Sequence, residues 1–190
     1  MDSSLNEKVK LSIQNLRDKK SRIYFLVQDT KGNARASVRL IYQMAKTLLD
    51  SGFNPIILHE KNDYAGVVAW MDEEYMSIPH KSIEGQNLEI SPEDFIVVPE
   101  VFGYIMEQIK NLPCGKIVLT QNYSHIVETL QPGQSWSQYG FLKCITTNEK
   151  QQEYIESVMR QCDFDILKPL ITDNFFPKIL PAMPIIGVHT

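Results

Sequence analysis

Short apolar runs recur along the chain at intervals that fit the strands of a buried sheet. The densest is Ile23–Val27, which follows Arg22 and leads into a polar loop. Each run is rich in Val, Ile or Leu and is bounded by polar or turn-forming residues, which is typical of strands. The pattern predicts strands at residues 22–27, 55–59, 95–99, 116–121, 142–147 and 164–167, with a weaker one at 81–83.

Between these runs, apolar residues return at helical spacing. In residues 37–51, Val38, Ile41, Ala45 and Leu48 form one stripe, and Gly52 is placed to end the helix. The spacing predicts helices at residues 6–18, 37–51, 102–111 and 149–161, and a short one at 66–71. The stretch 122–140 is predicted to be a polar-aromatic loop.

Strands that alternate with helices predict the fold class. We expect an α/β, Rossmann-like three-layer domain with a mostly parallel sheet and helices on both faces. This domain is expected to span residues 1–180. Residues 181–190 contain the apolar run Ile185–His189 after two prolines. This run fits either an interlobe linker that starts a missing second lobe or an edge strand of the same sheet.

Composition narrows the functional classes. The 190 residues carry a formal net charge of −4, which argues against a nucleic-acid binder. Cys114, Cys144 and Cys162 have no zinc or redox spacing, so we expect reduced, mostly buried thiols in a cytoplasmic protein. The polar amino terminus predicts no signal peptide. The apolar run near residue 185 is too short to span a membrane.

Polar side chains follow nearly every predicted strand. In a parallel sheet these positions share one edge, where a crevice can bind a polyhydroxylated or phosphorylated ligand. For each residue, the alternative is a polar loop that merely covers this edge. The candidate ligand-binding residues are Asp29, Lys31, Gly32, Arg35, Glu100, Asn122, Tyr123, His125, Asn148 and Glu149.

Several of these candidates have two readings. Lys31 and Arg35 can meet a phosphate or carboxylate, or remain solvated bases. Asp29 can hold a sugar hydroxyl or cap the turn that follows it. His125 can bind a ligand or transfer a proton, whereas His59 at the end of an apolar run is expected to be structural. No catalytic nucleophile is assigned.

Other residues offer weaker chemistry. Trp136 and Tyr139 can stack on a sugar or close their loop over the core. Asp163 and Asp165 form a D-x-D pair, which is found in metal-dependent sugar transfer, but the pattern here favours a short acidic turn before a strand. No metal site and no bound cofactor are predicted.

The residues Arg22–Lys61 resemble the opening of a GT-B fold glycosyltransferase of the family-4-like group. They share its strand, glycine-containing loop and helix, with the A-x-x-L-x-x-x-G pattern at Ala45, Leu48 and Gly52. The stretches Lys116–His125 and Thr146–Glu149 are similar to later parts of the same lobe. The family loop often has two adjacent glycines, whereas this loop has Gly32 alone.

The resemblance implies an acceptor-binding lobe of a hexosyltransferase, which acts together with a second lobe of the same polypeptide. That second lobe binds the nucleotide-sugar donor and carries an E-x7-E pair, which this sequence lacks. The implied acceptor is a saccharide or a lipid-linked saccharide. The implied location is the cytoplasm, including the inner face of the membrane. The isolated lobe is expected to be inactive. The alternative is a stand-alone, non-catalytic module that binds a nucleotide or sugar phosphate.

Overall fold

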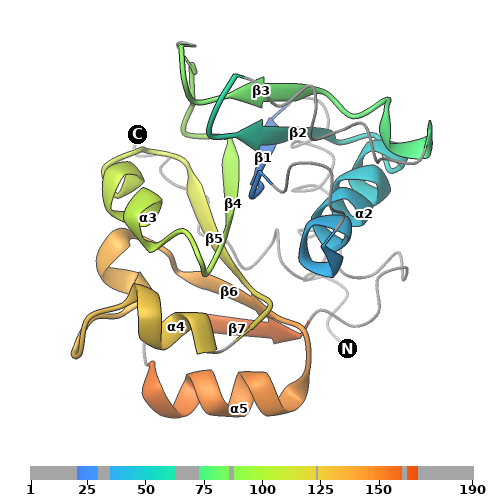
Figure 1. Cartoon of the computed structure of the whole chain (residues 1–190). Helices are drawn as coiled ribbons and strands as arrows, with labels where there is room; N and C mark the ends of the chain where they lie inside the picture. Colours follow the sequence, from blue (N-terminus) through green and yellow to red (C-terminus); the bar gives the residue numbers. More distant parts are fainter. Residues whose placement is uncertain are drawn as a thin grey trace, which may run out of the picture.

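The computed structural model describes residues 21–29, 35–62, 73–85, 88–122, 124–159 and 162–166 (Figure 1). Three expected elements lie outside these ranges: the helices at 6–18 and 66–71 and the run Ile185–His189. The expected domain boundary after residue 180 also lies outside them. Among the candidate site residues, Lys31, Gly32 and Tyr123 fall outside the described part.

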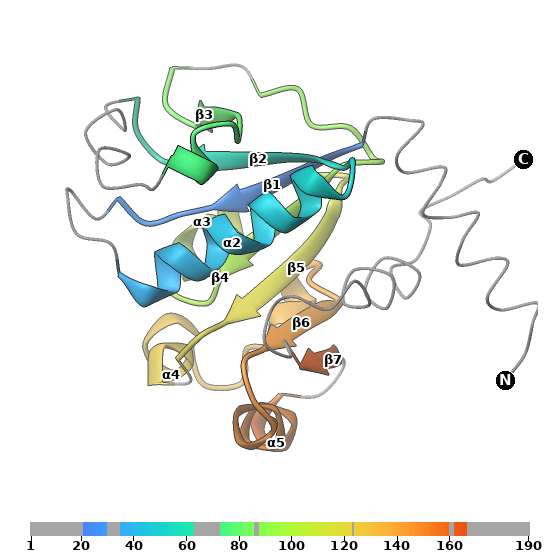
Figure 2. The same cartoon turned by 90° about the vertical axis from the view of Figure 1, so that its right-hand side faces the viewer.

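The described strands form one seven-stranded sheet in the order β3-β2-β1-β4-β5-β6-β7, and each neighbouring pair is parallel. Figure 2 shows the twisted sheet running from β3 to β7. The order 3-2-1-4-5-6 is that of the Rossmann fold, which confirms the predicted class. The strands are β1 (Arg22–Leu26), β2 (Asn54–His59), β3 (His80–Ser82), β4 (Phe95–Pro99), β5 (Gly115–Thr120), β6 (Lys143–Thr146) and β7 (Asp163–Ile166).

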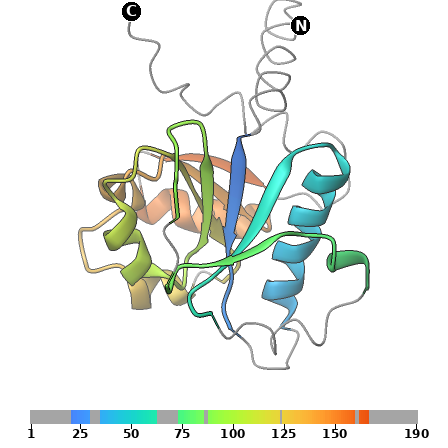
Figure 3. The same ribbon diagram turned by 90° about the horizontal axis from the view of Figure 1, so that it is seen from above.

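Helices cover both faces of the sheet. Figure 3 shows α2 on one side of the strands and α3 on the other. The helical segments are α2 (Ala36–Asp50), η3 (Glu73–Tyr75), α3 (Gly103–Ile109), α4 (Ser124–Thr129), η4 (Trp136–Tyr139) and α5 (Glu149–Val158). Three layers follow from this arrangement, as the alternating pattern predicted.

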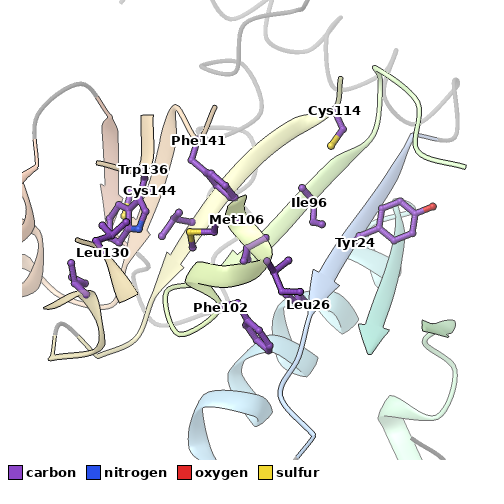
Figure 4. Close-up of a cluster of buried hydrophobic side chains, with 14 of the residues drawn as sticks. Tyr24, Leu26, Ile96, Phe102, Met106, Cys114, Leu130, Trp136, Phe141 and Cys144 are labelled. Carbon is purple, nitrogen blue, oxygen red and sulfur yellow. The ribbon is translucent and has the colours of Figure 1, made fainter. Parts of the chain in front are cut away.

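Side chains alternate between the two faces along β1. Ile23 and Phe25 pack in the core under α2, whereas Tyr24 and Leu26 pack in the core under α3, α4 and α5. Both sets are buried, so the strand reads as a continuous apolar run rather than an alternating one. Figure 4 shows the second core, with Tyr24 at one end, Leu26 and Phe102 between, and Trp136 at the other end.

Two glycines fix the geometry of the helices. Gly52 has a φ of +82°, and the N–H groups of Gly52 and Phe53 donate to the carbonyls of Leu49 and Leu48. This Schellman motif ends α2 at the predicted place. Gly103 starts α3 against the end of α4, where a Cβ atom would lie 2.7 Å from the carbonyl oxygen of Thr129. Only glycine allows this close approach of the two helices.

The predicted loop at 122–140 is wrong, because the stretch contains α4 and η4. Asn122 caps α4: its Oδ1 accepts hydrogen bonds from the backbone N–H and the hydroxyl of Ser124, at 3.1 and 2.8 Å. Trp136 is 0% exposed and packs in the core, so it cannot stack on a sugar. Six helical residues are too few to show a clear period in the sequence.

The D-x-D pair is also placed differently from the prediction. Asp163 and Asp165 lie within β7, paired in register with Lys143 and Ile145 of β6, and not in a turn before the strand. The prediction failed because two acids are unfavourable in strands by propensity, whereas pairing with a central strand decides the structure here.

Candidate functional site

The carboxyl edge of the sheet has its topological switch point between β1 and β4. The chain runs outward from β1 to β2 and β3 on one side, and from β4 to β5, β6 and β7 on the other. Ligands of open α/β sheets bind outside the strand ends at this point. In Figure 2, the arrowheads of β1 and β5 point to the edge at which α2 begins.

Glu100 lies directly after β4 and is the central polar residue of this edge. Its side chain is only 1% exposed. Its Oε1 accepts a hydrogen bond from the backbone N–H of Asn122 at 2.7 Å, and its Oε2 accepts one from Gln121 at 3.1 Å. Burial raises the pKa of the Glu100 carboxyl, and these two N–H groups oppose the rise only in part. A buried carboxyl with a raised pKa is a recognised mark of functional sites.

His125 lies beside this carboxylate. Its Nδ1 is 3.5 Å from Oε1 of Glu100, and the Nδ1 atom is buried although the side chain is 38% exposed. The exposed surface therefore belongs to the other atoms of the side chain. The ring is placed by the start of α4, where the His125 N–H donates to the carbonyl of Asn122 at 3.2 Å.

The pair has defined chemistry. The Nδ1 atom faces Oε1 of Glu100 at 3.5 Å without a hydrogen bond to it, and a proton on Nδ1 would leave Nε2 as an acceptor. A ligand hydroxyl that donates to Nε2 would therefore be polarised by His125, with Glu100 stabilising the imidazole. We define Glu100, Asn122 and His125 as the β4–β5 cluster.

The start of α2 is tied to the same edge. Gln121, after β5, donates its Nε2–H to the carbonyl of Ser37 in the first turn of α2 at 2.8 Å. Arg35 is exposed at the N-cap of this helix, and Asp29 is exposed after β1. The structure therefore brings Asp29 and Arg35 to the edge that holds the β4–β5 cluster, as predicted.

Asn148 and Glu149 serve a different purpose. Asn148 caps α5, because its Oδ1 accepts a hydrogen bond from the N–H of Gln151 at 2.9 Å. The Oε1 of Gln151 in turn accepts from the N–H and the hydroxyl of Thr147, both at 2.8 Å. Glu149 is in the first turn, where a negative charge favours the helix. These contacts give both candidates a structural role at the end of β6.

A histidine pair that joins the end of β2 to the start of β3 was not predicted. His59 Nε2 lies 2.8 Å from His80 Nδ1, and the rings stack at 5.1 Å with an angle of 13°. Burial and then the neighbouring His80 lower the pKa of His59 to about 4, although Asp29 acts to raise it. Burial also lowers the pKa of His80. The pair is therefore neutral at pH 7, and His59 is buried at the end of β2.

A second unpredicted contact joins Glu60 and Tyr104. The Tyr104 hydroxyl donates to the carboxylate of Glu60, although the two residues are 44 positions apart. Glu60 follows β2 and Tyr104 is in the first turn of α3 after β4. Since β1 lies between β2 and β4, this contact crosses the carboxyl end of β1. No short-range pattern in the sequence predicts a contact between residues this far apart.

Two further observations limit the chemistry. Within the described ranges, no group of three or more His, Cys, Asp or Glu side chains is arranged to hold a metal ion. Cys114 and Cys144 are buried, as predicted. None of the helices in the described part is both long and apolar enough to cross a membrane.

Comparison of the chain with models of protein families, with curated proteins and with solved structures found no match in any of the three searches.

Proposed function

We propose that this chain is the acceptor-binding lobe of a GT-B-type glycosyltransferase. Its partner lobe would bind a nucleotide sugar, and its own carboxyl edge would hold the saccharide or lipid-linked acceptor. The sequence resemblance and the Rossmann-like fold support the proposal. The observation that carries it is the β4–β5 cluster, because a buried carboxylate lies 3.5 Å from a histidine nitrogen at the carboxyl edge of the sheet.

Each residue of the edge has a part in this proposal. His125 accepts a hydrogen bond from an acceptor hydroxyl through Nε2, and Glu100 keeps the imidazole in the required tautomer. Asp29 accepts from a second hydroxyl, and Arg35 donates to a ring or hydroxyl oxygen. The lobe contributes to the rate by orienting the acceptor toward the donor. No catalytic nucleophile is assigned to this lobe, and the resemblance implies transfer without a metal. A lipid-linked acceptor would place the protein at the cytoplasmic face of a membrane.

The strand order also favours a second function. The order 3-2-1-4-5-6 is that of dinucleotide-binding domains, which hold a phosphate at the helix that follows β1. In this alternative the chain is a stand-alone module for a nucleotide or a sugar phosphate, and α2 is the helix that faces the phosphate.

Calorimetric titration separates the two functions. The probes are maltose, lactose, UDP-glucose and GDP-mannose. Under the transferase proposal, at least one disaccharide binds, and the His125→Ala variant weakens that binding about tenfold, because a hydrogen bond to a polar site contributes about 1 to 1.5 kcal/mol. Glu149→Gln is the control, since Glu149 belongs to the start of α5, and its affinity should equal that of the wild type.

Two results would contradict the acceptor assignment. One is micromolar binding of a nucleotide sugar by this chain alone, which would support the stand-alone module. The other is equal disaccharide affinity in the wild type and in His125→Ala, which would remove the β4–β5 cluster from the site.

A further inference from the structure

Tyr104 is an exposed aromatic side chain that is nevertheless held in place. It is 53% exposed, whereas most large apolar side chains of the described part are buried. At one end its hydroxyl donates to Glu60. At the other, its ring is 6.1 Å from that of Phe102, a core residue, at an angle of 53°. The ring is therefore fixed at both ends while much of its surface faces solvent.

The anchoring has a cost that folding alone does not explain. An exposed tyrosine loses side-chain freedom when its hydroxyl is tied to a single partner. Glu60 is likewise restrained. A hydrogen bond between partly exposed groups contributes little to the stability of the fold. A ring that is ordered before a ligand arrives does, however, bind without that ordering cost. The arrangement therefore fits a ligand platform better than a stabilising contact.

The position of Tyr104 agrees with this role. The contact to Glu60 crosses the carboxyl end of β1, which is one side of the switch point. Gly103, the neighbour of Tyr104, packs against the last turn of α4, and α4 carries His125. The anchored ring and the β4–β5 cluster thus belong to adjoining segments of one edge.

We propose that Tyr104, held by Glu60, is the platform on which a pyranose ring of a neutral saccharide stacks. This inference rests on the proposed function and adds a ligand class to it. The apolar C–H face of a sugar packs on an aromatic ring, and its rim of hydroxyls needs acceptors. Glu60 provides them, because its carboxylate has acceptor capacity beyond the bond to Tyr104.

The same geometry disfavours an anionic ligand at the ring. A phosphate stacked beside Tyr104 would lie next to the negative charge of Glu60, and like charges repel strongly when they are partly desolvated. Burial, followed by Glu60, raises the pKa of Tyr104, so its hydroxyl stays protonated as a donor at neutral pH. The platform is therefore specific for uncharged sugars over sugar phosphates.

The test compares three variants of the full chain with one control. The probes are methyl β-glucopyranoside, maltose and glucose 1-phosphate, measured by calorimetry and by saturation-transfer NMR. Tyr104→Ala should weaken maltose binding about five- to tenfold, because an aromatic contact contributes about 0.5 to 1.5 kcal/mol. Tyr104→Phe and Glu60→Gln should weaken it about two- to threefold, since the ring remains but its anchor changes.

The control is Tyr154→Ala, which removes another exposed tyrosine, from α5 after β6, and β6 lies two strands from β4 in the sheet. It should leave maltose affinity unchanged. In the wild type, the bound sugar protons should shift upfield because they lie over the ring, and this shift should disappear in Tyr104→Ala but persist in Tyr104→Phe. Thermal unfolding of each variant confirms that it is folded.

The outcomes separate this inference from the proposed function. If His125→Ala weakens maltose binding but Tyr104→Ala does not, the platform is wrong and the acceptor site stands. If glucose 1-phosphate binds more tightly than the methyl glucoside, and Tyr104→Ala weakens it, the neutral specificity is overturned. If the wild type binds none of the sugars, both the platform and the acceptor site are wrong.

Discussion

Strand β4 has a buried carboxylate at each end, and the two behave in opposite ways. Asp94 precedes the strand and Glu100 follows it, and both residues are 1% exposed. Asp94 is bound by the Arg22 guanidinium, with Nη2 at 2.7 Å from Oδ2, and by the backbone N–H groups of Arg22 and Ser91 at 2.8 Å. Glu100 has two backbone N–H groups and a histidine at 3.5 Å.

The pKa values follow from these partners. Burial alone would raise the pKa of both carboxyls. At Asp94, the hydrogen bonds and the charge of Arg22 outweigh burial, and the pKa falls below its ordinary value. At Glu100 the burial effect wins, and the pKa rises. Equal burial therefore leaves one carboxylate satisfied, at the closed amino edge, and one poised to interact, at the carboxyl edge where ligands bind.

Asp94→Asn should cause the largest effect. It leaves the Arg22 guanidinium, whose side chain is 26% exposed, without its charged partner, and a hydrogen bond to a charged group contributes about 1.5 to 3 kcal/mol to the free energy of unfolding. Urea denaturation at pH 7 measures the loss. The matched control is Asp50→Asn, which breaks the exposed pair with Lys46 on α2 and should cost less than about 0.5 kcal/mol. Equal losses in the two variants would mean that Asp94 is no more important than a surface carboxylate.

Acidification extends the comparison to the histidine pair, whose partner is another base. The folded pKa of His59 is about 4, below the unfolded value of 6.5. Its stabilisation is therefore complete above pH 6.5 and is lost as the pH falls toward 4. Between about pH 7 and pH 5, His59 alone should remove about 2 kcal/mol of stability. In His59→Gln this part of the pH dependence should be absent, and an unchanged slope would contradict the buried neutral pair.

Glu100→Gln should change stability least, by about 1 kcal/mol at pH 7, because the charge that it removes is unfavourable where it lies. The pH dependence has a defined sign. Since the folded pKa is raised, the contribution of Glu100 is favourable below its ordinary value of 4.5 and is lost as the pH rises through the folded pKa. As the pH rises above 4.5, the free energy of unfolding of the Glu100→Gln variant should therefore increase relative to that of the wild type.

Asp94→Asn should change the pH dependence of the free energy of unfolding in the opposite direction. The contribution of Asp94 is present above its ordinary value of 3.8 and is lost as the pH falls through its lowered folded pKa. Denaturation curves across this range, for both variants, give two difference profiles. If the stability differences of the two variants change with pH in the same direction, the two carboxylates are in equivalent environments. The proposed difference between the two ends of β4 would then be wrong.

The sheet could be predicted from the sequence because each strand is marked by a short apolar run that can be recognised from neighbouring residues alone. Phe95–Pro99 is a run of apolar residues between turn signals, and the structure places β4 at these residues. α2 was equally clear, since its apolar stripe is long and Gly52 ends it. α4 was missed because its start depends on the side chain of Asn122, and its six residues show no periodicity.

The site could be predicted only as a set of strand ends. That rule correctly brought Glu100, Asn122 and His125 to one edge. It also included Asn148, which caps α5, and Glu149, which lies in the first turn of that helix, because capping and ligand binding use the same residue types at the same positions. It did not give the contact between Tyr104 and Glu60, because a contact between residues 44 positions apart is decided by the order of the strands and not by the local pattern.

The pairing of β1 with β4 has a consequence for how the protein is made. Arg22 binds a residue 72 positions later in the chain. At synthesis rates of about 5 to 20 residues per second, the ribosome needs about 4 to 14 seconds to add that length. Until then β1 has β2 as a neighbour and an apolar edge on its other side. An unpaired strand edge can pair with another chain, so this interval exposes the nascent chain to aggregation.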